Sequence, residues 1–402
     1  MKVVVVGGGI VGTAAAYFLA QQGDEVTLLE AETLGYGASG RNPGFVWLHL
    51  RNPGFALEIA RAGRDLYQLL AAELPIDFEL RSSGGLIFFT SDDQARIAQE
   101  FVEARTGAGL PMEMLDGSDV RQIVPPVRPD VVCGTYCPLD AHINTGLLVK
   151  SLAAGAQQLG AKVLEHHTVT RLGLDGDRVV GVETAAGRFE ADEVVVAAGV
   201  WSPQLLGAVG VTVPIGGERL QIMGTDPMPD VHIEPVVYGP SAAKQYSLFR
   251  QLPSWDERHF REDYEDEAGL EMLELLAQRR DGRILLGCAM DYPQNMAMHP
   301  TLEGILAMTA ATSVDFPGLR TAPIERVWAG LLPYTPDTLP VIDRAGPGVI
   351  VAGGHVYGNA AGPMTGKLVA EMVAGQPTSI DLGECRLDRD VSLAPSGVAT
   401  RW

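Results

Sequence analysis

The sequence predicts an α/β fold, and three features of its first thirty residues carry that prediction. Residues 2–6 are a short β-branched run without polar alternation, typical of a parallel strand that is buried on both faces. Apolar residues at helical spacing follow, and Gly23 marks the end of that helix. Residues 25–30 form a second strand-like run. A strand, a helix and a strand in this order make one βαβ unit.

A glycine motif joins the first strand to the helix, because Gly7-Gly8-Gly9-Ile10-Val11-Gly12 matches Gly-x-Gly-x-x-Gly. The first glycine allows a tight turn, the second lets the backbone approach a pyrophosphate, and the third lets helix and strand pack closely. The helix N-terminus offers N–H groups and partial positive charge to phosphates. Glu30 closes the second strand and can accept from ribose hydroxyls. The alternative, a glycine-rich turn without a ligand, is disfavoured by this context. The expected contacts are Gly7, Gly9, Ile10, Val11, Gly12, Glu30 and Ala31.

Length and composition limit the number of domains, the partners and the location that we expect. The chain has 402 residues, 46% of them hydrophobic and 20% charged, which suits two closely joined globular domains. Its formal net charge of −20 repels phosphate backbones and anionic membranes, so we expect no nucleic-acid partner. No apolar run approaches the roughly 20 residues of a membrane span. A basic leader with a cleavage site is also missing from the start, so we expect no signal peptide and a cytoplasmic location.

The four cysteines do not form a C-x-x-C pair or any paired metal-ligand spacing, so no metal site is expected. Cys133 and Cys137 fit one helical turn or a pair of loops. We expect all four cysteines to be reduced thiols, with a disulfide or iron–sulfur role as the alternative.

Further along the chain, periodicity predicts helices at residues 53–74, 92–107, 145–160 and 362–373. Strands are expected at 81–89, 162–165, 169–174, 178–183, 189–198, 219–224, 283–289 and 348–352. Residues 259–274 read as an irregular acidic stretch, and the tail 383–402 as polar and poorly packed.

The choice between NAD and FAD depends on later segments. FAD is long and needs contacts scattered through a chain, and three segments have that character. Ser39, Arg41 and Asn42 lie in a glycine-rich loop suited to a phosphate. Residues 195–201 end a strand where a nucleotide would cross. A glycine-rich turn at 353–359 precedes a helix whose N-terminus can stabilise negative charge on reduced flavin. Together they predict FAD contacts at Ser39, Arg41, Asn42, Val169, Ala198, Gly199, Trp201, Gly354, His355, Gly358 and Asn359.

The order of these segments resembles the D-amino-acid oxidase superfamily of flavoproteins, which includes glycine oxidase, sarcosine oxidase and amino-acid dehydrogenase flavin subunits. The matching stretches run from Val4 to Gly366 and include residues 4–30, 37–42, 81–86, 197–202, 280–287, 328–337 and 354–366. They are specific to the superfamily but do not specify a substrate.

The resemblance implies a Rossmann-like FAD-binding domain interleaved with a mixed-sheet substrate domain. The FAD domain would comprise residues 1–46, 145–215 and 326–382, and the substrate domain residues 47–144 and 216–325. It also implies oxidation of a C–N bond by hydride transfer to flavin N5, followed by hydrolysis of the imine. Such chemistry needs positioning and exclusion of water more than a strong acid–base pair.

The chain departs from the family pattern at the substrate anchor. Glycine oxidase-like members carry Arg at the third position of the Gly-Leu-x-Pro segment, whereas this chain has Leu332 there. Arg51 and His49 become candidates, since sarcosine oxidase-like members hold a carboxylate with an Arg in this region; a solvated or salt-bridged arginine is the alternative. Tyr334, by its place in the motif, is expected near the pocket, or else as a core aromatic. His355 is expected beside the flavin.

Two further departures concern the flavin. No Cys lies in residues 328–336, where some members attach it, so FAD should be non-covalent. Leu285 takes the place of the Lys that activates oxygen in sarcosine oxidase-like members, and Lys244 is the only Lys in either substrate-domain stretch. This favours a dehydrogenase that passes electrons to an acceptor or partner subunit, such as the catalytic subunit of a hetero-oligomer. The insert 238–274 is expected to be a lid, a subunit interface or a solvated loop.

Two other functions stay open. The same fold hosts oxidation of a 2-hydroxy acid, which needs a base for the hydroxyl proton, and His49 or His355 could serve. A non-catalytic, FAD-bound assembly subunit is the third alternative. The sequence does not specify the substrate, its stereochemistry, the electron acceptor or the oligomeric state.

Overall fold

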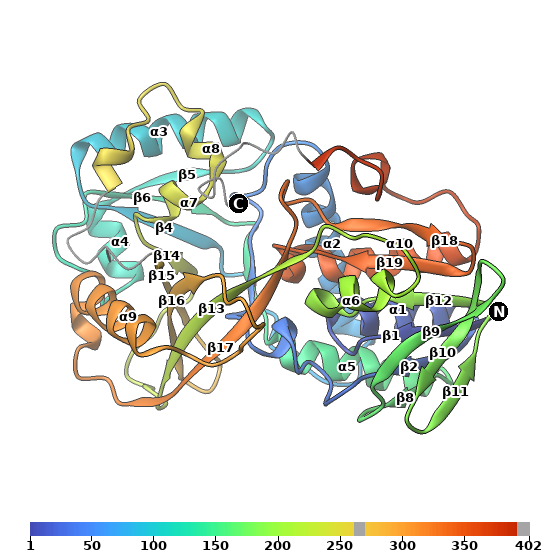
Figure 1. The fold of residues 1–402 in the computed structure, drawn as a ribbon. Coiled ribbons are helices and arrows are strands. Elements are labelled where there is room, and N and C mark those ends of the chain that lie inside the picture. Colours follow the sequence, from blue (N-terminus) through green and yellow to red (C-terminus); the bar gives the residue numbers. More distant parts are fainter. Residues whose placement is uncertain (261–269, 392–402) are drawn as a thin grey trace.

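The computed structural model describes residues 1–260 and 270–391, and its secondary structure confirms the predicted α/β fold. Figure 1 shows two lobes side by side, each built on its own β-sheet. The lobe that contains the N-terminus holds a six-stranded sheet, and the other lobe holds an eight-stranded sheet. The fold therefore has two distinct surfaces that can face a common ligand.

The six-stranded sheet contains the predicted βαβ unit at its centre. Its strands pair in parallel except for the antiparallel β18–β19 pair at one edge. The valines of β1 are buried on both faces, which explains their unbroken apolar run. In order across the sheet, the strands are β18 (Val341–Gly346), β19 (Val349–Gly353), β12 (Glu193–Val196), β1 (Lys2–Val6), β2 (Glu25–Leu29) and β8 (Lys162–Leu164).

Helices and a small sheet cover this lobe. Helix α1 packs against both α5 and α10, and α2 packs on α10. The helices are α1 (Ile10–Gln21), α2 (Phe55–Glu73), α5 (Thr145–Gln158), α6 (Ser202–Gly207) and α10 (Gly358–Val373), with short 3-10 turns at η1 (Ala38–Gly40) and η2 (Gly199–Trp201). The three-stranded sheet consists of β9 (Val169–Asp175), β10 (Arg178–Thr184) and β11 (Gly187–Glu190).

The eight-stranded sheet forms the second lobe and has two buried faces. One face joins the core that continues into the first lobe, and the other packs on α9 (Leu302–Asp315) and α4 (Gly117–Ile123). In order, its strands are β17 (Ile324–Tyr334), β13 (Gly216–Thr225), β16 (Ile284–Asp291), β15 (Glu271–Gln278), β14 (Val236–Tyr238), β4 (Gly85–Phe89), β6 (Cys133–Cys137) and β5 (Glu113–Asp116).

Helix α3 (Asp92–Gly107) lies on the outer side of this lobe (Figure 1). The remaining elements of the described chain are short, and the last of them, η5, contacts β18 of the first lobe. They are β3 (Phe45–Val46), β7 (Ala141–His142), α7 (Ala242–Gln245), α8 (Ser247–Arg250), η3 (Glu257–Phe260), η4 (Pro317–Leu319) and η5 (Gly383–Cys385).

Several sequence expectations need correction. Strand β17 was expected in the FAD domain from residue 326 on, but it is hydrogen-bonded along its length to β13 of the eight-stranded sheet. The expected strand 189–198 is two strands, β11 and β12, in different sheets. Helix α10 begins at Gly358 rather than 362, with Pro363 inside its first two turns. Cys133 and Cys137 lie on a strand, where residues four apart share a face.

The C-terminal tail is better packed than expected over its described part. Cys385 is fully buried, and Arg389 makes an ion pair with Asp337 at 2.6 Å. Leu387 donates its backbone N–H to Asp343. Of the insert 238–274, residues 261–269 lie outside the described residues. Residues 238–250 are mostly buried, and α8, Ser254 and His259 contact α3, so a solvated loop is wrong for most of the described part of the insert.

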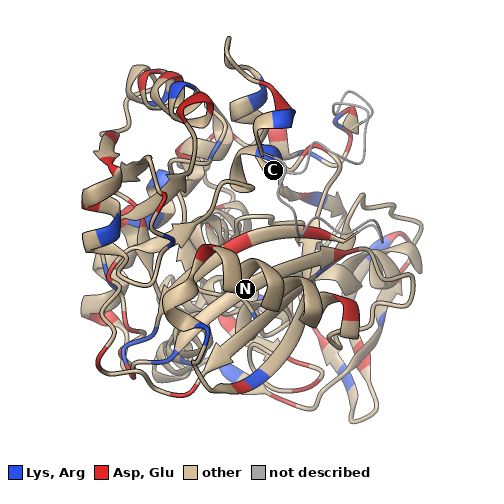
Figure 2. Cartoon of the chain, turned by 90° about the vertical axis from the view of Figure 1, so that its left-hand side faces the viewer, with Lys and Arg blue, Asp and Glu red and all other residues tan. Residues whose placement is uncertain are grey.

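Charge and hydropathy patterns agree with a folded domain pair. Figure 2 shows acidic and basic residues interspersed over the outer helices and loops, and the strands are largely without charge. Among the described residues, no helix combines the length and the apolar character that a membrane crossing requires.

Candidate functional site

A cavity of about 770 Å³ is lined by residues of both lobes. The first lobe contributes the glycine turn after β1, the end of β2 and the turn before α10. The second lobe contributes residues of β13, β14, β15, β16 and β17, and the loop after β3 lines it as well. The cavity therefore has a nucleotide wall and a roof that come from different sheets.

The glycine turn has the geometry that its motif predicts. Gly7 has φ +111°, and a Cβ there would lie 2.5 Å from the Ala197 carbonyl oxygen. A Cβ on Gly12 would lie 1.9 Å from the Gly7 carbonyl oxygen, so only glycine lets α1 pack this closely on β1. Gly12 itself does not line the cavity, which matches its predicted packing role.

Glu30 and Ser39 are held in place by backbone N–H groups at the start of α1. The Glu30 carboxylate accepts from the N–H of Gly8 at 2.6 Å and from that of Glu32 at 2.9 Å. The Ser39 hydroxyl accepts from the Ile10 N–H at 2.9 Å. Both side chains line the cavity, so each is positioned for a ligand by groups it already contacts.

Asn42 and Asn359 join three sequence-distant segments beside the cavity. The Asn359 amide donates to Asn42 Oδ1 at 2.9 Å, and the Thr145 hydroxyl contacts the side-chain oxygens of both asparagines at 3.0 Å. Sequence reasoning assigned both residues to the cofactor, and both do line the cavity. Their hydrogen bonds show that they also tie the turn before α10 to the loop after β2.

Arg41 is placed differently from the expectation. It does not line the cavity, since its guanidinium donates to the carbonyl oxygens of Tyr36 at 2.8 Å and Ala329 at 3.1 Å. It also lies over the Tyr36 ring. Arg41 therefore connects the loop to β17 and is withdrawn as a phosphate ligand.

The residues present fit a bound FAD. The first turn of α1 contains no acidic side chain, so no carboxylate on this turn competes with a phosphate for the partial positive charge of the helix N-terminus. Gly354 has φ +75°, and a Cβ there would lie 2.8 Å from the Thr335 methyl carbon, which keeps the turn before α10 close to β17. The other predicted contacts that line the cavity are Gly7, Gly9, Ile10, Val11, Ala31, Val169, Ala198, Gly199, Trp201, Gly354, His355 and Gly358.

Arg51 lies in the roof half of the cavity as a buried cation. It is only 5% exposed, and its Nε has no hydrogen-bond partner among the described residues. Its guanidinium lies 4.7 Å from the centre of the Tyr357 ring and 5.5 Å from that of Tyr246. The ion pairs of the described residues do not include Arg51. A buried charge of this kind is costly unless an anion accompanies it.

Three tyrosines around Arg51 were missed as site residues by sequence reasoning. Tyr238, Tyr246 and Tyr357 all line the cavity. Burial raises the pKa of Tyr246 and of Tyr357, while the charge of Arg51 opposes that rise, so both phenols stay protonated. Tyr238 and Tyr246 are eight residues apart, whereas Tyr357 lies more than a hundred residues further along the chain, and the three carry no shared motif.

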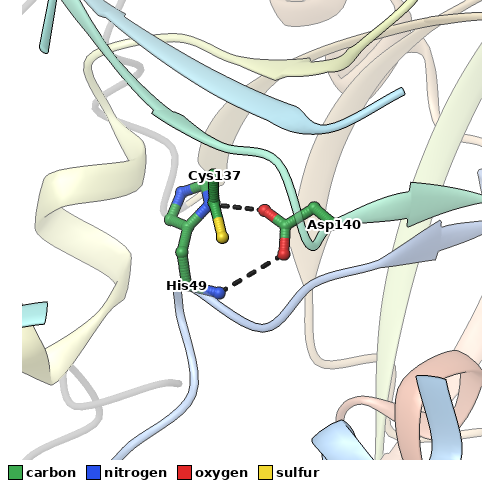
Figure 3. A group of neighbouring side chains, drawn as sticks. All are labelled: His49, Cys137 and Asp140. Atoms are coloured by element: carbon green, nitrogen blue, oxygen red, sulfur yellow. Dashed lines mark hydrogen bonds and ion pairs between the residues drawn. The ribbon is translucent and has the colours of Figure 1, made fainter. Parts of the chain in front are cut away.

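His49 is buried behind the cavity and does not line it, so it is withdrawn as a catalytic residue. Its Nδ1 lies 2.5 Å from the Asp140 carboxylate, and Cys137 lies beside this pair (Figure 3). The three groups have metal-ligating atoms within 4.8 Å of one another. Asp140, however, already accepts from the Leu48 N–H at 2.6 Å, and burial raises the pKa of the Cys137 thiol. The cluster therefore functions as a hydrogen-bonded support.

That support continues to Arg105, a fully buried residue of α3. Its guanidinium donates to the Arg51 carbonyl oxygen at 2.7 Å and to that of Leu48 at 3.4 Å. Burial and the nearby Arg51 lower the pKa of Arg105 to about 10, so it stays charged at neutral pH. Arg105 and Asp140 thus hydrogen-bond to the same loop, residues 48–51. Arg105 donates to carbonyl oxygens of the loop and Asp140 accepts from its N–H groups, and together they hold Arg51 toward the cavity.

Tyr334 is not near the cavity surface, contrary to its expected place. Its ring packs on Gly216 and meets the Tyr292 ring edge-on at 5.6 Å. Leu332 does line the cavity. The cavity lining along β17 ends at Pro333, and Tyr334, the last residue of the strand, lies beyond it.

His355 lies in the cavity wall as a neutral imidazole. Burial lowers its pKa to about 4. Its Nε2 is 2.8 Å from the Thr365 hydroxyl, which itself donates to the Ala361 carbonyl oxygen at 3.1 Å. The hydroxyl must therefore accept from His355, and the imidazole proton is assigned to Nε2.

Comparison with known proteins agrees with this site. A family model described as FAD dependent oxidoreductase matches residues 2–372. A glycine oxidase of Bacillus licheniformis is 28% identical over 392 residues, covering 94% of each chain. A D-amino acid dehydrogenase of Azorhizobium caulinodans is 25% identical, covering 97% of this chain and all of its own. The crystal structure of glycine oxidase from Bacillus cereus superposes with a TM-score of 0.81 at 22% identity, covering 97% of this chain and 99% of its own.

Proposed function

The chain belongs to the FAD-dependent oxidoreductase family, so its cofactor is FAD, and we propose that it oxidises the C–N bond of an amine or amino acid. The names of two relatives, a glycine oxidase and a D-amino acid dehydrogenase, support this substrate class. These names do not distinguish an oxidase from a dehydrogenase or one amino acid from another, so the proposal rests on the residues that line the cavity.

The observation that carries the proposal is Arg51. It is the only Lys or Arg among the described residues that line the cavity, and it lies in the roof half among aromatic rings. An α-carboxylate would pair with its guanidinium and satisfy the unpartnered Nε. Arg51 would thus replace the anchor that Leu332 cannot provide.

When bound, FAD supplies the hydride acceptor for this reaction. The chain supplies the positioning: Arg51 orients the substrate through its carboxylate, and the apolar roof excludes water from the reacting C–H bond. Among the described lining residues, the carboxylates are Glu30 and Glu32, which follow β2 at the nucleotide wall. No acidic side chain beside Arg51 therefore stabilises an ammonium ion, which favours the neutral amine that the reaction requires.

The electron acceptor is proposed to be other than oxygen. No lysine is among the described residues that line the cavity, and β16 presents Cys288 and Met290 there. Leu285, the residue expected at this place, does not line it. The one cation among the described lining residues, Arg51, is assigned to the substrate carboxylate, so no separate ammonium group is left to favour formation of a reduced oxygen anion. This supports a dehydrogenase that passes electrons to another acceptor or to a partner subunit.

A 2-hydroxy acid is the second candidate, and His355 is the observation that favours it. The imidazole lines the cavity and is neutral at neutral pH, because burial lowers its pKa to about 4, and the same shift makes it a weak base for the hydroxyl proton. Arg51 would anchor the carboxylate of either substrate class.

Anaerobic mixing of the purified holoenzyme with candidate substrates separates the two. Amino acids, N-methyl amino acids, opines and 2-hydroxy acids are tested in turn, and loss of the absorbance of oxidised flavin is followed. We expect reduction by a compound with a C–N bond. Reduction by hydroxy acids alone would contradict the proposal. Re-oxidation by a dye but only slowly by air would support a dehydrogenase.

A further inference from the structure

We infer that the substrate is an amino acid with a large, uncharged, apolar side chain, received by the eight-stranded sheet beside Arg51. The inference rests on the proposed function, since it takes Arg51 as the carboxylate anchor. It concerns the side chain of the substrate, which is the part that Arg51 does not contact.

A continuous path of contacts leads from the anchor to an apolar wall. The guanidinium of Arg51 lies over the Tyr246 ring, and that ring stacks on Tyr238 with centroids 6.3 Å apart. Tyr238 on β14 is paired directly with Leu275 on β15. Both residues line the cavity, so the apolar wall begins at Leu275, which the rings of Tyr246 and Tyr238 connect to Arg51.

The wall continues across two further strands. Leu220 on β13 pairs directly with Met290 on β16, and Ile222 lies two residues further along β13. All three line the cavity, as does Leu273 on β15. Ile222 and Met290 are at most 1% exposed. Neighbouring strands therefore present one unbroken apolar surface to the ligand.

Two irregularities interrupt the strand pairing along this surface. The β13–β16 register shifts between Gln221 and Ile222, so that Ile222 pairs with Gly287, while Met290 stays directly opposite Leu220 and shares the cavity face with Cys288. The β15–β16 register shifts between Met272 and Leu275. Glu274 does not line the cavity, and its carboxylate accepts from the Ser241 N–H at 3.1 Å. The carboxylate nearest to this wall along β15 is thus committed to another segment.

The charges of the lining residues decide what the wall accepts. Glu30, one of the two lining carboxylates, is held at the other wall by the Gly8 N–H at 2.6 Å. Among the described lining residues, a lysine-like side chain would find no acidic partner at the roof, and a second carboxylate would find no second guanidinium. Glu218 of β13 is buried near Cys288 but does not line the cavity. A charge buried without a partner loses affinity, by more than about a hundredfold here.

Size is selected by the same surface. Glycine would leave the apolar wall uncovered, whereas each methylene that fits an apolar pocket gains about tenfold or more in selectivity. We therefore expect kcat/KM to rise along a series from glycine to amino acids with branched or aromatic side chains.

The first test measures binding without turnover. The holoenzyme is titrated by calorimetry with acetate, butyrate and hexanoate, and then with adipate and ε-aminocaproate, which match the length of hexanoate but end in a carboxylate and an ammonium group. We expect affinity to rise with chain length and to fall by more than about a hundredfold for either charged end. Equal affinities for hexanoate and a charged analogue would overturn the inference.

The second test uses neighbouring leucines on β15. Leu275 lines the cavity and Leu276 faces the opposite core, and both are at most 2% exposed. Leu275→Ala should shift the ratio of kcat/KM for large over small side chains by at least about tenfold, with hexanoate affinity changing in parallel. Leu276→Ala should leave the ratio unchanged. If either alanine variant loses FAD, the matched Leu→Val pair repeats the test, with a smaller shift in the same direction.

The outcomes separate the inference from the proposed function. Flavin reduction by glycine or charged amino acids in preference to apolar ones would overturn the inference and leave the proposed function standing. Flavin reduction by no amine or amino acid would remove the proposed function, whatever the carboxylate series shows.

Discussion

The two walls of the cavity bind in different ways. The nucleotide wall presents backbone: glycines after β1, the N–H groups at the start of α1, and Glu30 held by the Gly8 N–H. The roof presents side chains, with Arg51, tyrosines and aliphatic residues from five strands and from several connecting segments. A backbone wall tolerates little substitution, because the main chain cannot move aside. A side-chain wall can change its ligand by exchanging residues while the sheet stays the same.

The largest expected effect breaks the backbone wall. Gly12→Ala places a Cβ 1.9 Å from the Gly7 carbonyl oxygen, so α1 must move away from the turn. Overpacking of this kind costs about 1–3 kcal/mol and displaces the N–H groups that face the phosphates. We expect the ratio of flavin to protein in the purified enzyme to fall at least tenfold. Gly207→Ala in α6 is the control, since a Cβ there meets nothing within 4 Å. Full flavin content in Gly12→Ala would contradict the backbone argument.

The next effect removes the anchor from the roof and leaves the nucleotide wall intact. Arg51→Met keeps an extended apolar side chain without the charge. We expect KM for carboxylate substrates to rise at least thirtyfold, because truncating one partner of a buried charge pair costs about 2–5 kcal/mol. FAD content should stay unchanged.

Two controls sharpen this measurement. Arg96→Met removes an exposed arginine of α3 and should have no effect. An amine without a carboxylate should be bound by wild type and Arg51→Met almost equally. An unchanged KM for the carboxylate substrate in Arg51→Met would remove Arg51 from the site.

The smallest effect concerns the support behind the roof. Arg105→Lys keeps the charge but not the planar fork that reaches the carbonyl oxygens of Leu48 and Arg51. We expect KM for carboxylate substrates to rise about tenfold while kcat stays within about twofold, because Arg51 is displaced and the chemistry is not. Arg96→Lys on the same helix is the matched control. A loss of thermal stability with KM unchanged would show that Arg105 supports only the fold.

Sequence reasoning found the nucleotide wall because its signals are local. The six residues from Gly7 to Gly12 lie in one turn, and Glu30 follows the adjacent strand. In the roof, closeness in the sequence did not predict which residues face the cavity. His49 and Arg51 are two residues apart, yet only Arg51 lines the cavity, because Asp140 and Arg105 fix a turn that directs the two side chains differently. Arg41 is turned from the expected phosphate contact for a similar reason, because its guanidinium donates to the Ala329 carbonyl oxygen of β17.

Nothing in the sequence distinguishes the aromatic and aliphatic residues of the roof from residues of a hydrophobic core. Tyr246 and Tyr357 meet Arg51 from segments more than a hundred residues apart. Met290 reaches the cavity because β16 places it opposite Leu220 of β13, and Cys288 shares that face, so their position depends on the register with the partner strand.

The sequence by itself determined the α/β fold and the dinucleotide site, because a glycine turn, a helix N-terminus and a strand-end carboxylate are set by neighbouring residues. The sequence indicated FAD through later segments scattered along the chain. It also supplied Arg51 as one of several candidate anchors. Only the tertiary structure decided which candidate faces the cavity and which surface accompanies it. The physical reason is that the roof is made by pairing between distant strands, where one residue of register decides whether a side chain meets the ligand or the core.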